Sequence, residues 1–525
     1  MIYKGKGKDP RSPSSYRPIS LANSFYKLYA SMLQHRIASA IDYILSPHQF
    51  GFRKPRSAST PIFLIRRLLE HFERHTTSLY LLFLDWQQAF DSVSREAVQT
   101  ALVRYGLPEA IIKPVMALFQ DCKFFVQDGS FFSSTHSQVR GIRQGCPLSP
   151  YLFIILLSSI MSDVSIQFHN TYGFTPWVHS AAHPLQHLEF ADDTALMSRS
   201  HTTIHRLLHI LQYQASKQGL LLNANKCQLL RLHTDHDVSL STTFTPSRPC
   251  QCQHCGGIDP LPHPCQVVDH PTYLGIVLDA TASSTPDCLR RFSQASSACR
   301  SLFPLFSNKL IPIKRRLQLH NQIVLAILLY GSESQTYTPA QLQRFNSLHF
   351  KVLRQIFGVK SSYYHRVLAP SSDSCSNAFL ARKAAAFLPD QLIPSQIISK
   401  KRLQYLGHIM RHPYSLEHAM IFGPSHSFLR LSSPHRRGAP RAHWYELAFT
   451  EAYHRLHLLA MNQHPRPYEI HHPGYRTATL DLHKSYQGSH MPTWFDNTRQ
   501  FRQLAPYWQD RSKWGQLVNP YCQDT

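Results

Sequence analysis

The stretch Phe190-Ala191-Asp192-Asp193 decides the fold of this chain, together with Asp85, which stands much earlier in the sequence. Each acidic site ends a strand-like run, residues 79–84 before Asp85 and residues 188–190 before the pair. Adjacent acids between hydrophobic runs are typical of a β-hairpin turn, because Asp tolerates turn geometry. Three carboxylates at one sheet edge would repel one another unless divalent cations lay between them. Oxygen ligands suit Mg²⁺, and two such ions about 3.5–4 Å apart serve nucleotidyl transfer, so the pattern predicts a two-magnesium site of the polymerase type.

An Asp-Asp dipeptide alone is weak evidence, because most such pairs are solvated turns. The order of other segments along the chain adds to it: Arg17-Pro18-Ile19-Ser20-Leu21, Gly51-Phe52-Arg53, Asp85 to Asp91, Arg143-Gln144-Gly145-Cys146-Pro147-Leu148-Ser149-Pro150, Phe190 to Asp193, Lys226 and Tyr273-Leu274-Gly275. That succession resembles the reverse transcriptase of LINE-type (non-LTR) retrotransposons, which is related to group II intron reverse transcriptases. The resemblance covers residues 3–358, and residues 143–150 are its most specific stretch.

The resemblance implies an α+β, right-hand polymerase fold with fingers, a palm containing an antiparallel sheet, and a helical thumb. We expect the fingers at 1–80, the palm at 81–285 with a cysteine-rich insertion at 245–268, and the thumb at 286–360. Residues 361–525 form a mainly helical C-terminal region whose later part gives no domain assignment. The chain is expected to begin inside the fingers, without the family's usual N-terminal extension or an endonuclease, as a fragment of a larger element would.

The implied function is that of an RNA-directed DNA polymerase, which extends a primer 3′-hydroxyl with dNTPs on an RNA template by two-metal nucleotidyl transfer. Composition agrees, since 55 Lys and Arg oppose 31 Asp and Glu and the formal charge is +24. Such a field attracts a polyanion, although a basic protein with non-specific interactions would have the same charge. The alternative function is a catalytically inactive, nucleic-acid-binding remnant of such an element.

The resemblance also implies the residues that contact the incoming nucleotide. Arg17 would bind the triphosphate and Arg53 the template or nucleotide, because a guanidinium matches phosphate geometry; either could instead be a surface charge. Gln144 and Gly145, at an exposed turn before a buried helix, would lie near the nucleotide 3′-hydroxyl. Phe90 would pack under the sugar and exclude a 2′-hydroxyl, which predicts dNTP use, or it could be an ordinary core aromatic.

Two further segments carry predicted roles. Lys226 follows a strand and, by resemblance, stabilises the pyrophosphate leaving group or donates a proton to it, unless it is a solvated surface residue. Tyr273, Leu274 and Gly275 resemble the hairpin that grips the primer terminus. The resemblance assigns the two Mg²⁺ ions to Asp85, Asp192 and Asp193, while Asp91 is interpreted as structural.

The insertion contains a cysteine cluster that the resemblance does not require. Its thiolates could hold structural zinc with tetrahedral geometry, or the segment could be an irregular excursion without metal. The candidate ligands are Cys250, Cys252, Cys255 and Cys265, with His263 as an alternative.

Nothing in the sequence indicates secretion or membrane insertion. Lysines follow directly after the first residues, and the longest apolar run, 151–157, is far shorter than the ~20 residues that span a bilayer. Eleven cysteines in 525 residues do not form a disulfide framework. We therefore expect an intracellular protein, nuclear or cytoplasmic, without a transmembrane segment; the oligomeric state is left open.

Overall fold

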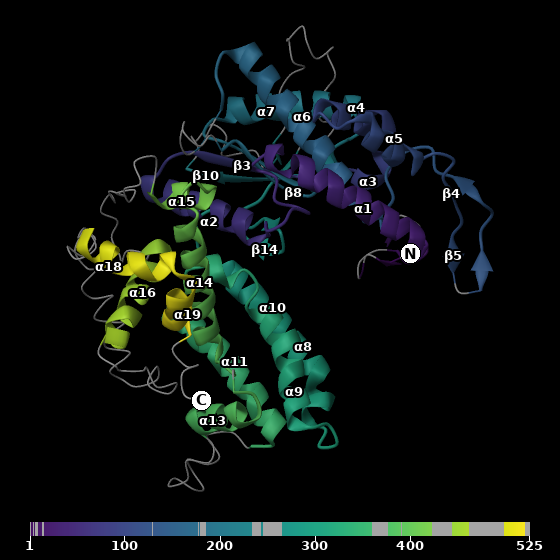
Figure 1. The fold of residues 1–525 in the computed structure, drawn as a ribbon. Helices are drawn as coiled ribbons and strands as arrows, with labels where there is room; N and C mark the ends of the chain where they lie inside the picture. The colour runs from purple at the N-terminus through teal and green to yellow at the C-terminus, as the bar shows by residue number, and fades with distance from the viewer. Residues whose placement is uncertain are drawn as a thin grey trace. The chain divides into compact units, whose positions relative to one another are not determined.

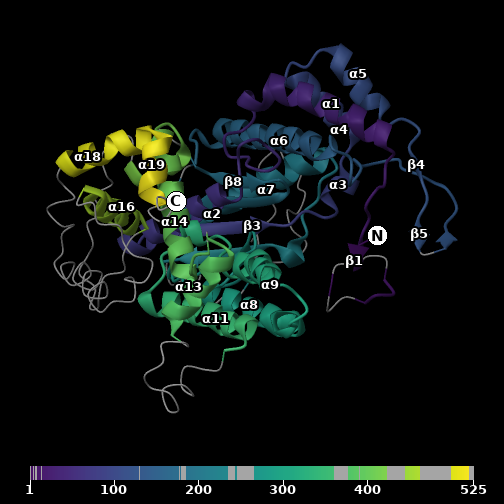
Figure 2. The ribbon, with the colours of Figure 1, turned by 60° about the horizontal axis from the view of Figure 1, so that its bottom comes forward.

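The computed structural model describes residues 2–3, 5, 9–12, 15–128, 130–176, 178, 185–233, 243–244, 265–359, 376–389, 391–422, 444–460 and 498–519. The chain divides into two compact units, shown in Figures 1 and 2. The first unit contains residues 1–61 and 77–274, and the second contains residues 62–76 and 275–525. Residues 62–76, which fall within the predicted fingers, are thus grouped with the second unit.

A six-stranded sheet forms the centre of the first unit, in the order β11-β12-β10-β3-β9-β8. All neighbouring strands are antiparallel except β10 and β12. The strands are β3 (Leu79–Leu84), β8 (His187–Phe190), β9 (Asp193–Ser198), β10 (Gln228–Leu232), β11 (Thr243–Phe244) and β12 (Cys265–Val267). Every residue of β3 is buried, as expected for a strand with both faces covered, which explains its unbroken apolar sequence. The predicted α+β class with a mainly antiparallel palm sheet is confirmed.

Helices pack on the sheet face that carries Leu82, Leu84 and Leu196, and their side chains share one core. Among them, α7 lies against β9 and β3, and α6 packs on α7 and α4 (Figure 1). The helices of this unit are α1 (Ser24–Ile41), α3 (Ala89–Ser92), α4 (Arg95–Arg104), α5 (Glu109–Ala117), α6 (Ser149–Tyr172) and α7 (His201–Lys217). By length and composition α6 could cross a membrane, but 72% of its apolar window is buried inside this unit, as in a core helix.

Short elements complete the first unit. They are β1 (Ile2–Tyr3), β2 (Tyr16–Arg17), the 3-10 turns η2 (Asp42–Ile44) and η3 (Ala224–Lys226), β4 (Lys123–Phe124), β5 (Gln127–Asp128), β6 (Phe131–Phe132), β7 (His136–Ser137) and β13 (Thr272–Tyr273). Of the predicted zinc ligands, Cys250, Cys252, Cys255 and His263 lie outside the described residues, and Cys265 is described only as the first residue of β12.

In its described residues the second unit is helical apart from the short strand β14 (Ile276–Val277). Its elements are α2 (Ser59–His75, within this unit from residue 62), α8 (Thr285–Ser307), α9 (Ile313–Leu319), the π-helix η5 (His320–Leu325), α10 (Ala326–Leu328), η6 (Ser332–Ser334), α11 (Pro339–Phe357), α13 (Asn377–Phe387), α14 (Pro394–Arg411), α15 (Leu416–Phe422), α16 (Trp444–Ala460), α18 (Thr498–Gln509) and α19 (Arg511–Val518). One core joins α8 and α11, and a second joins α14, α16, α18 and α19.

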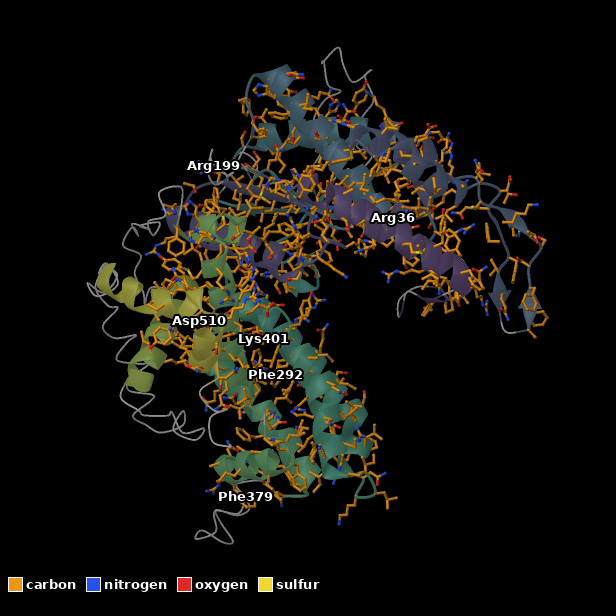
Figure 3. All side chains as sticks on the ribbon, in the orientation of Figure 1. Arg36, Arg199, Phe292, Phe379, Lys401 and Asp510 are labelled. Carbon is orange, nitrogen blue, oxygen red and sulfur yellow. The ribbon has the colours of Figure 1, made fainter. Side chains whose placement is uncertain are left out.

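Buried polar contacts connect these helices. Arg66 on α2 donates to Asp287 Oδ2 at 2.8 Å and to the Gly331 carbonyl at 2.6 Å. Lys401 on α14 donates to the Leu329 carbonyl at 3.2 Å (Figure 3). Because Arg66 and Asp287 are both buried, their charges are matched within the protein rather than by solvent.

Candidate active site

The three predicted carboxylates meet at one end of the palm sheet. Strands β3 and β9 pair antiparallel with Leu84 opposite Thr194. Asp85 and Asp193 each lie one residue beyond that pair, so they lie at the same end of the sheet. Strands β8 and β9 form a hairpin whose last pair is Phe190 with Asp193, which leaves Asp192 in the tight turn. The register of two buried strands therefore brings together acids that are far apart in sequence.

The electrostatics show that these acids act on one another. Burial raises the pKa of Asp193 to about 6, and the nearby charges of Asp192 and Asp85 add to the shift. Burial also raises the pKa of Asp192, with a further contribution from Asp85, whereas Arg17 acts in the opposite direction. Asp192 and Asp193 still reach solvent, so their hydration is reduced rather than lost. Like charges held this close disfavour ionisation, and a cation placed between them would reverse the effect.

The donor set fits magnesium without forming a ready-made cage. In the described part of the chain, no group of three or more His, Cys, Asp and Glu side chains has metal-holding geometry. Magnesium is usually held by one or two carboxylates together with water and substrate phosphates, rather than by protein ligands alone. The mutually repelling oxygens of Asp85, Asp192 and Asp193 are hard ligands at one solvent-accessible edge, which matches that mode of binding.

Lys226 lies in the same site. Its ammonium group donates to Asp85 Oδ2 at 3.0 Å, and both side chains are substantially exposed, at 61% and 38%. The backbone amide of Asn223 donates to the carbonyl of Asp85 at 2.7 Å, which ties the η3 turn to the end of β3. The structure therefore places a positive charge next to the acids, in contact with one of them.

The turn at Gln144 and Gly145 packs on the N-terminal segment. The Ser20 amide donates to the Gln144 carbonyl at 2.7 Å, and the Gln144 amide group donates to Asp91 Oδ2 at 3.2 Å. Gly145 has φ +111°, and a Cβ there would come within 2.5 Å of the Ser20 carbonyl oxygen. Only glycine permits both this backbone conformation and this close approach. Arg17, on β2 in the same N-terminal segment as Ser20, is exposed.

Phe90 was interpreted as a contact to the nucleotide sugar or as an ordinary core aromatic, and the structure shows a core residue with an accessible part. Its ring stacks on Phe153 of α6, with centroids 5.0 Å apart and planes at 17°, and it packs against the main core. It is only partly buried, however, so part of the side chain remains accessible. Phe90 is thus supported from beneath by the core, and its position in the short helix α3 follows closely after Asp85.

Arg53 does not have the predicted role of a template or nucleotide contact. Its side chain is buried, and its Nε donates to Asp42 Oδ1 at 3.1 Å. The remaining guanidinium donors reach Ser46 and Gln49 carbonyl oxygens and two further oxygens of Asp42. Because all five N–H donors already have partners, the group holds its own loop together and has none to offer a phosphate.

The predicted primer-grip residues lie where the chain passes from the first unit to the second. Tyr273 is buried in the first unit, and its ring packs against that of Phe83 of β3, with the ring centroids 5.2 Å apart. Burial raises the pKa of Tyr273, and the acids Asp193 and Glu189 add to that effect. Leu274 and Gly275 both have positive φ, +44° and +80°, and Gly275 begins the second unit.

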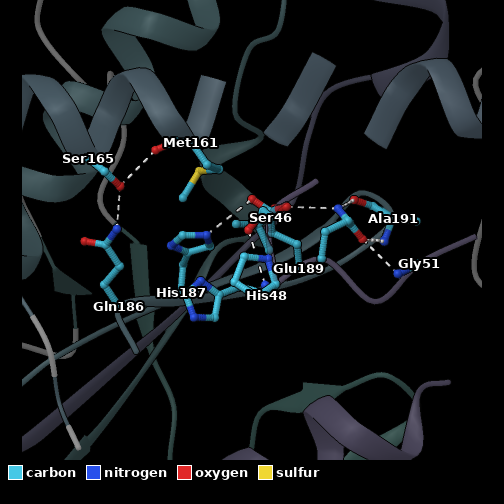
Figure 4. A network of polar contacts seen from close by, with 12 residues as sticks. Ser46, His48, Gly51, Met161, Ser165, Gln186, His187, Glu189 and Ala191 are labelled. Carbon is cyan, nitrogen blue, oxygen red and sulfur yellow. Dashed lines mark hydrogen bonds and ion pairs between the residues drawn. The ribbon is translucent and has the colours of Figure 1, made fainter. Parts of the chain in front are cut away.

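Two residues beside the Asp192 turn, Gln49 and Glu189, escaped the sequence reasoning, and Gly51 entered it only as part of the segment Gly51-Phe52-Arg53. Residues 48–51 run alongside β8, where the Phe50 amide donates to the Glu189 carbonyl at 2.8 Å and the Glu189 amide donates to the His48 carbonyl at 2.9 Å (Figure 4). Burial raises the pKa of the Glu189 carboxyl to about 8, so the group is mostly neutral at pH 7. In the sequence, the signal that could have pointed to this group of residues was a single Glu, Glu189, within an apolar strand-like run.

Comparisons with known proteins identify the family of this chain. The family model for reverse transcriptase (RNA-dependent DNA polymerase) matches residues 4–278. The Drosophila melanogaster Pol polyprotein from the type-2 retrotransposable element R2DM is 28% identical over 43% of this chain and 20% of its own length. The probable RNA-directed DNA polymerase from the D. melanogaster transposon BS is 27% identical over 63% of this chain and 34% of its own. This chain therefore spans about a third or less of those relatives.

Among solved structures, telomerase from Candida albicans in complex with a telomeric RNA fragment is similar, with a TM-score of 0.37 and 12% identity, over 66% of this chain and 57% of that one. The family model covers more than half of this chain and includes every acid of the site. The family predicted from the sequence is confirmed, and the relatives named above come from non-LTR retrotransposons. The chain belongs to the reverse transcriptase (RNA-dependent DNA polymerase) family.

Proposed function

We propose that this chain is an RNA-directed DNA polymerase that extends a primer 3′-hydroxyl with deoxynucleotides. The observation that carries the proposal is the meeting of Asp85, Asp192 and Asp193 at one sheet end, where burial raises the pKa of Asp192 and Asp193 and the charge of Asp85 adds to both shifts. Such repulsion is unfavourable for the protein alone and is useful only if a cation binds there.

Asp85, Asp192 and Asp193 would hold magnesium ions, which when bound activate the primer hydroxyl and neutralise charge on the triphosphate. Lys226, 3.0 Å from Asp85, presents an ammonium group that can attract the triphosphate and stabilise charge on the departing pyrophosphate. Arg17 is exposed and acts electrostatically on Asp192, so it can bind a phosphate close to the acids. Gln144 and Gly145 would position the nucleotide sugar, with Asp91 orienting the Gln144 amide.

Phe90 would select the sugar. Because its ring is backed by Phe153, it cannot easily retreat, and the accessible part would collide with a 2′-hydroxyl. Phe90→Ala should therefore admit ribonucleotides, measured as the ratio of rNTP to dNTP incorporation in primer extension. An active Phe90→Ala protein with unchanged sugar selectivity would show that another residue makes the choice.

The proposed partners are an RNA template, a DNA primer and dNTPs, and the proposed setting is intracellular. The net charge of +24 supports a polyanionic partner. Contacts of Lys and Arg with phosphates release counterions, so binding of a primer–template duplex should weaken steeply as salt rises.

Primer extension on an RNA template with dNTPs and Mg²⁺ tests the proposal, with Asp192→Asn as the matched variant. We expect incorporation by the unmodified chain and none above background for Asp192→Asn, because the amide removes one anionic ligand while keeping the side-chain shape. Binding of RNA without any incorporation would contradict the proposal and would instead indicate an inactive nucleic-acid-binding remnant.

A further inference from the structure

The side chain of Gln49 is bonded to the turn that carries Asp192. Gln49 is fully buried, and its Oε1 accepts hydrogen bonds from the amides of Ala191 at 3.0 Å and Gly51 at 2.8 Å. Its Nε2 donates to Glu189 Oε2 at 3.0 Å and, over a longer 3.4 Å, to the Ala191 carbonyl. One amide side chain thus contacts the peptide groups on both sides of Ala191.

Ala191 needs such support because its backbone is in the left-handed region, with φ +59°. An L-residue other than glycine adopts this conformation at a cost of roughly 1–2 kcal/mol. The carbonyl of Ala191 belongs to the peptide bond of Asp192, so the conformation of Ala191 sets the direction in which Asp192 leaves the hairpin. The contacts of Gln49 oppose relaxation of this turn.

The chain around Gln49 is built to approach the turn closely. A Cβ at Gly51 would lie 2.2 Å from the amide nitrogen of Ala191, so only glycine fits between the two backbones (Figure 4). The buried Glu189 gives the Gln49 amide group a fixed acceptor, and that contact sets which way the side-chain amide points. Backbone approach and side-chain orientation both place Gln49 Oε1 against Ala191.

We propose that Gln49 is a positioning residue for the polymerase reaction: by clamping the left-handed Ala191 peptide, it holds Asp192 in the direction needed to bind the catalytic metal. This inference rests on the proposed function. Gln49 does not touch substrate, and its effect is transmitted through the backbone of the turn. The partner Glu189 is the second half of the clamp.

Gln49→Ala tests the clamp. We expect kcat for primer extension to fall by about 10²-fold, as for a small misplacement of a reacting group. The KM for dNTP should change little, and the Mg²⁺ concentration giving half-maximal rate should rise. Hydrogen exchange of a peptide covering 186–193 should become faster in Gln49→Ala, since the Ala191 amide loses its acceptor.

The double variant Q49E/E189Q tests the chemistry of the clamp. It exchanges donor and acceptor between positions 49 and 189, so the carboxylate at 49 can accept from Ala191 and Gly51 while the amide at 189 donates to it. We expect it to recover most of the kcat lost in Gln49→Ala, together with slow exchange at the turn. A residue that only fills space would show no such dependence on donor and acceptor.

Gln186→Ala is the matched control. Gln186 is also a buried glutamine beside β8, but its amide group donates to Ser165 on α6, away from the turn (Figure 4). We expect a lower melting temperature for Gln186→Ala, with kcat and the Mg²⁺ requirement close to those of the unmodified chain.

The outcomes separate this inference from the proposed function. If Asp192→Asn is inactive while Gln49→Ala keeps normal kcat, Mg²⁺ requirement and exchange, the positioning role is overturned and the polymerase assignment stands. If the unmodified chain incorporates nothing, the proposed function fails. The clamp is then judged by exchange alone: faster exchange in Gln49→Ala but not Gln186→Ala supports it, and unchanged exchange overturns it.

Discussion

The acids of the two units have opposite electrostatic surroundings. In the second unit, Asp287 is buried and matched, with Arg66 at 2.8 Å, Arg291 at 3.6 Å and the Val277 amide at 3.0 Å. In the first unit, burial raises the pKa of Asp192 and Asp193, and the neighbouring charge of Asp85 adds to both shifts. One arrangement surrounds a carboxylate with buried guanidinium groups, and the other gathers several carboxylates at an accessible end of the sheet. The comparison distinguishes Asp287, which connects helices, from Asp85, Asp192 and Asp193, whose grouping favours the binding of a cation.

The largest effect is expected for a substitution of one of the first-unit acids, Asp85. In Asp85→Asn we expect primer extension to fall by at least about 10³-fold, since loss of a metal ligand removes several kcal/mol of transition-state stabilisation. The melting temperature should stay the same or rise, because a repulsive charge is removed. Primer extension and thermal denaturation measure the two quantities. A variant with activity near that of the unmodified chain would remove Asp85 from the site.

The second prediction concerns the buried acid of the second unit, Asp287, and the stability of the fold. Asp287→Ala leaves the buried Arg66 guanidinium without its carboxylate, so we expect a loss of about 3–5 kcal/mol in unfolding free energy. The matched control is Glu109→Ala, because Glu109 pairs with Lys113 at 3.0 Å with both side chains 75% exposed. That change should cost less than about 1 kcal/mol in denaturant titrations. Equal losses in the two variants would show that Asp287 is not a buried structural charge.

The third prediction concerns Glu189, which lies between these extremes because it is buried against the uncharged amide of Gln49, at 3.0 Å, and the ring of His187, at 3.8 Å. Its folded-state pKa of about 8 lies above the ordinary value of 4.5, so the folded protein binds the proton more tightly than the unfolded chain. The stabilisation is fully present below pH 4.5 and is lost as pH rises through 8. Glu189→Gln should remove this dependence.

Melting temperatures of the unmodified chain and Glu189→Gln between about pH 5 and pH 9 would measure the effect. We expect the melting temperature of the unmodified chain to fall relative to Glu189→Gln as pH rises, corresponding to about 1 kcal/mol or more. Parallel curves for the two proteins would show that Glu189 titrates normally in the fold.

The smallest expected effect concerns the exposed pair Lys226–Asp85, the counterpart of the buried pair Arg66–Asp287. Lys226→Ala should change the unfolding free energy by less than about 1 kcal/mol, because solvent and salt already screen the pair. Denaturant titrations at low and high salt measure this. A loss as large as that of Asp287→Ala would mean that Lys226 holds the fold rather than serving the site.

Sequence reasoning succeeded where local pattern and chemistry coincide. The run 79–84 predicted a strand leading into Asp85, and the pair Asp192-Asp193 predicted a hairpin turn; the structure has β3 at 79–84 and a hairpin that turns at residues 191–192. Gly145 was recognised by its motif, but the reason for it, a Ser20 carbonyl oxygen 2.5 Å from where a Cβ would stand, is a tertiary contact. The strand and the turn depend on neighbours in sequence, which is why periodicity and residue type suffice to find them.

Sequence reasoning failed for polar side chains whose partners are set by the folded chain. Arg53 was predicted to contact the template or the nucleotide, but its guanidinium donates to Asp42, Ser46 and Gln49. Gln49 attracted no prediction at all, because an uncharged side chain in a short loop gives no periodic signal. The destination of a guanidinium or an amide is set by which backbone groups the fold brings within hydrogen-bonding distance.

By itself, the amino-acid sequence determined the acids, the apolar strands that carry them and the family to which they belong. The tertiary structure alone decided that β3 and β9 meet in the register that joins Asp85 to Asp193, and that Gln49 supports the turn beside Asp192. The physical reason is that a strand's composition follows from burial, which is written residue by residue, whereas register and side-chain partners depend on packing between segments far apart in the chain.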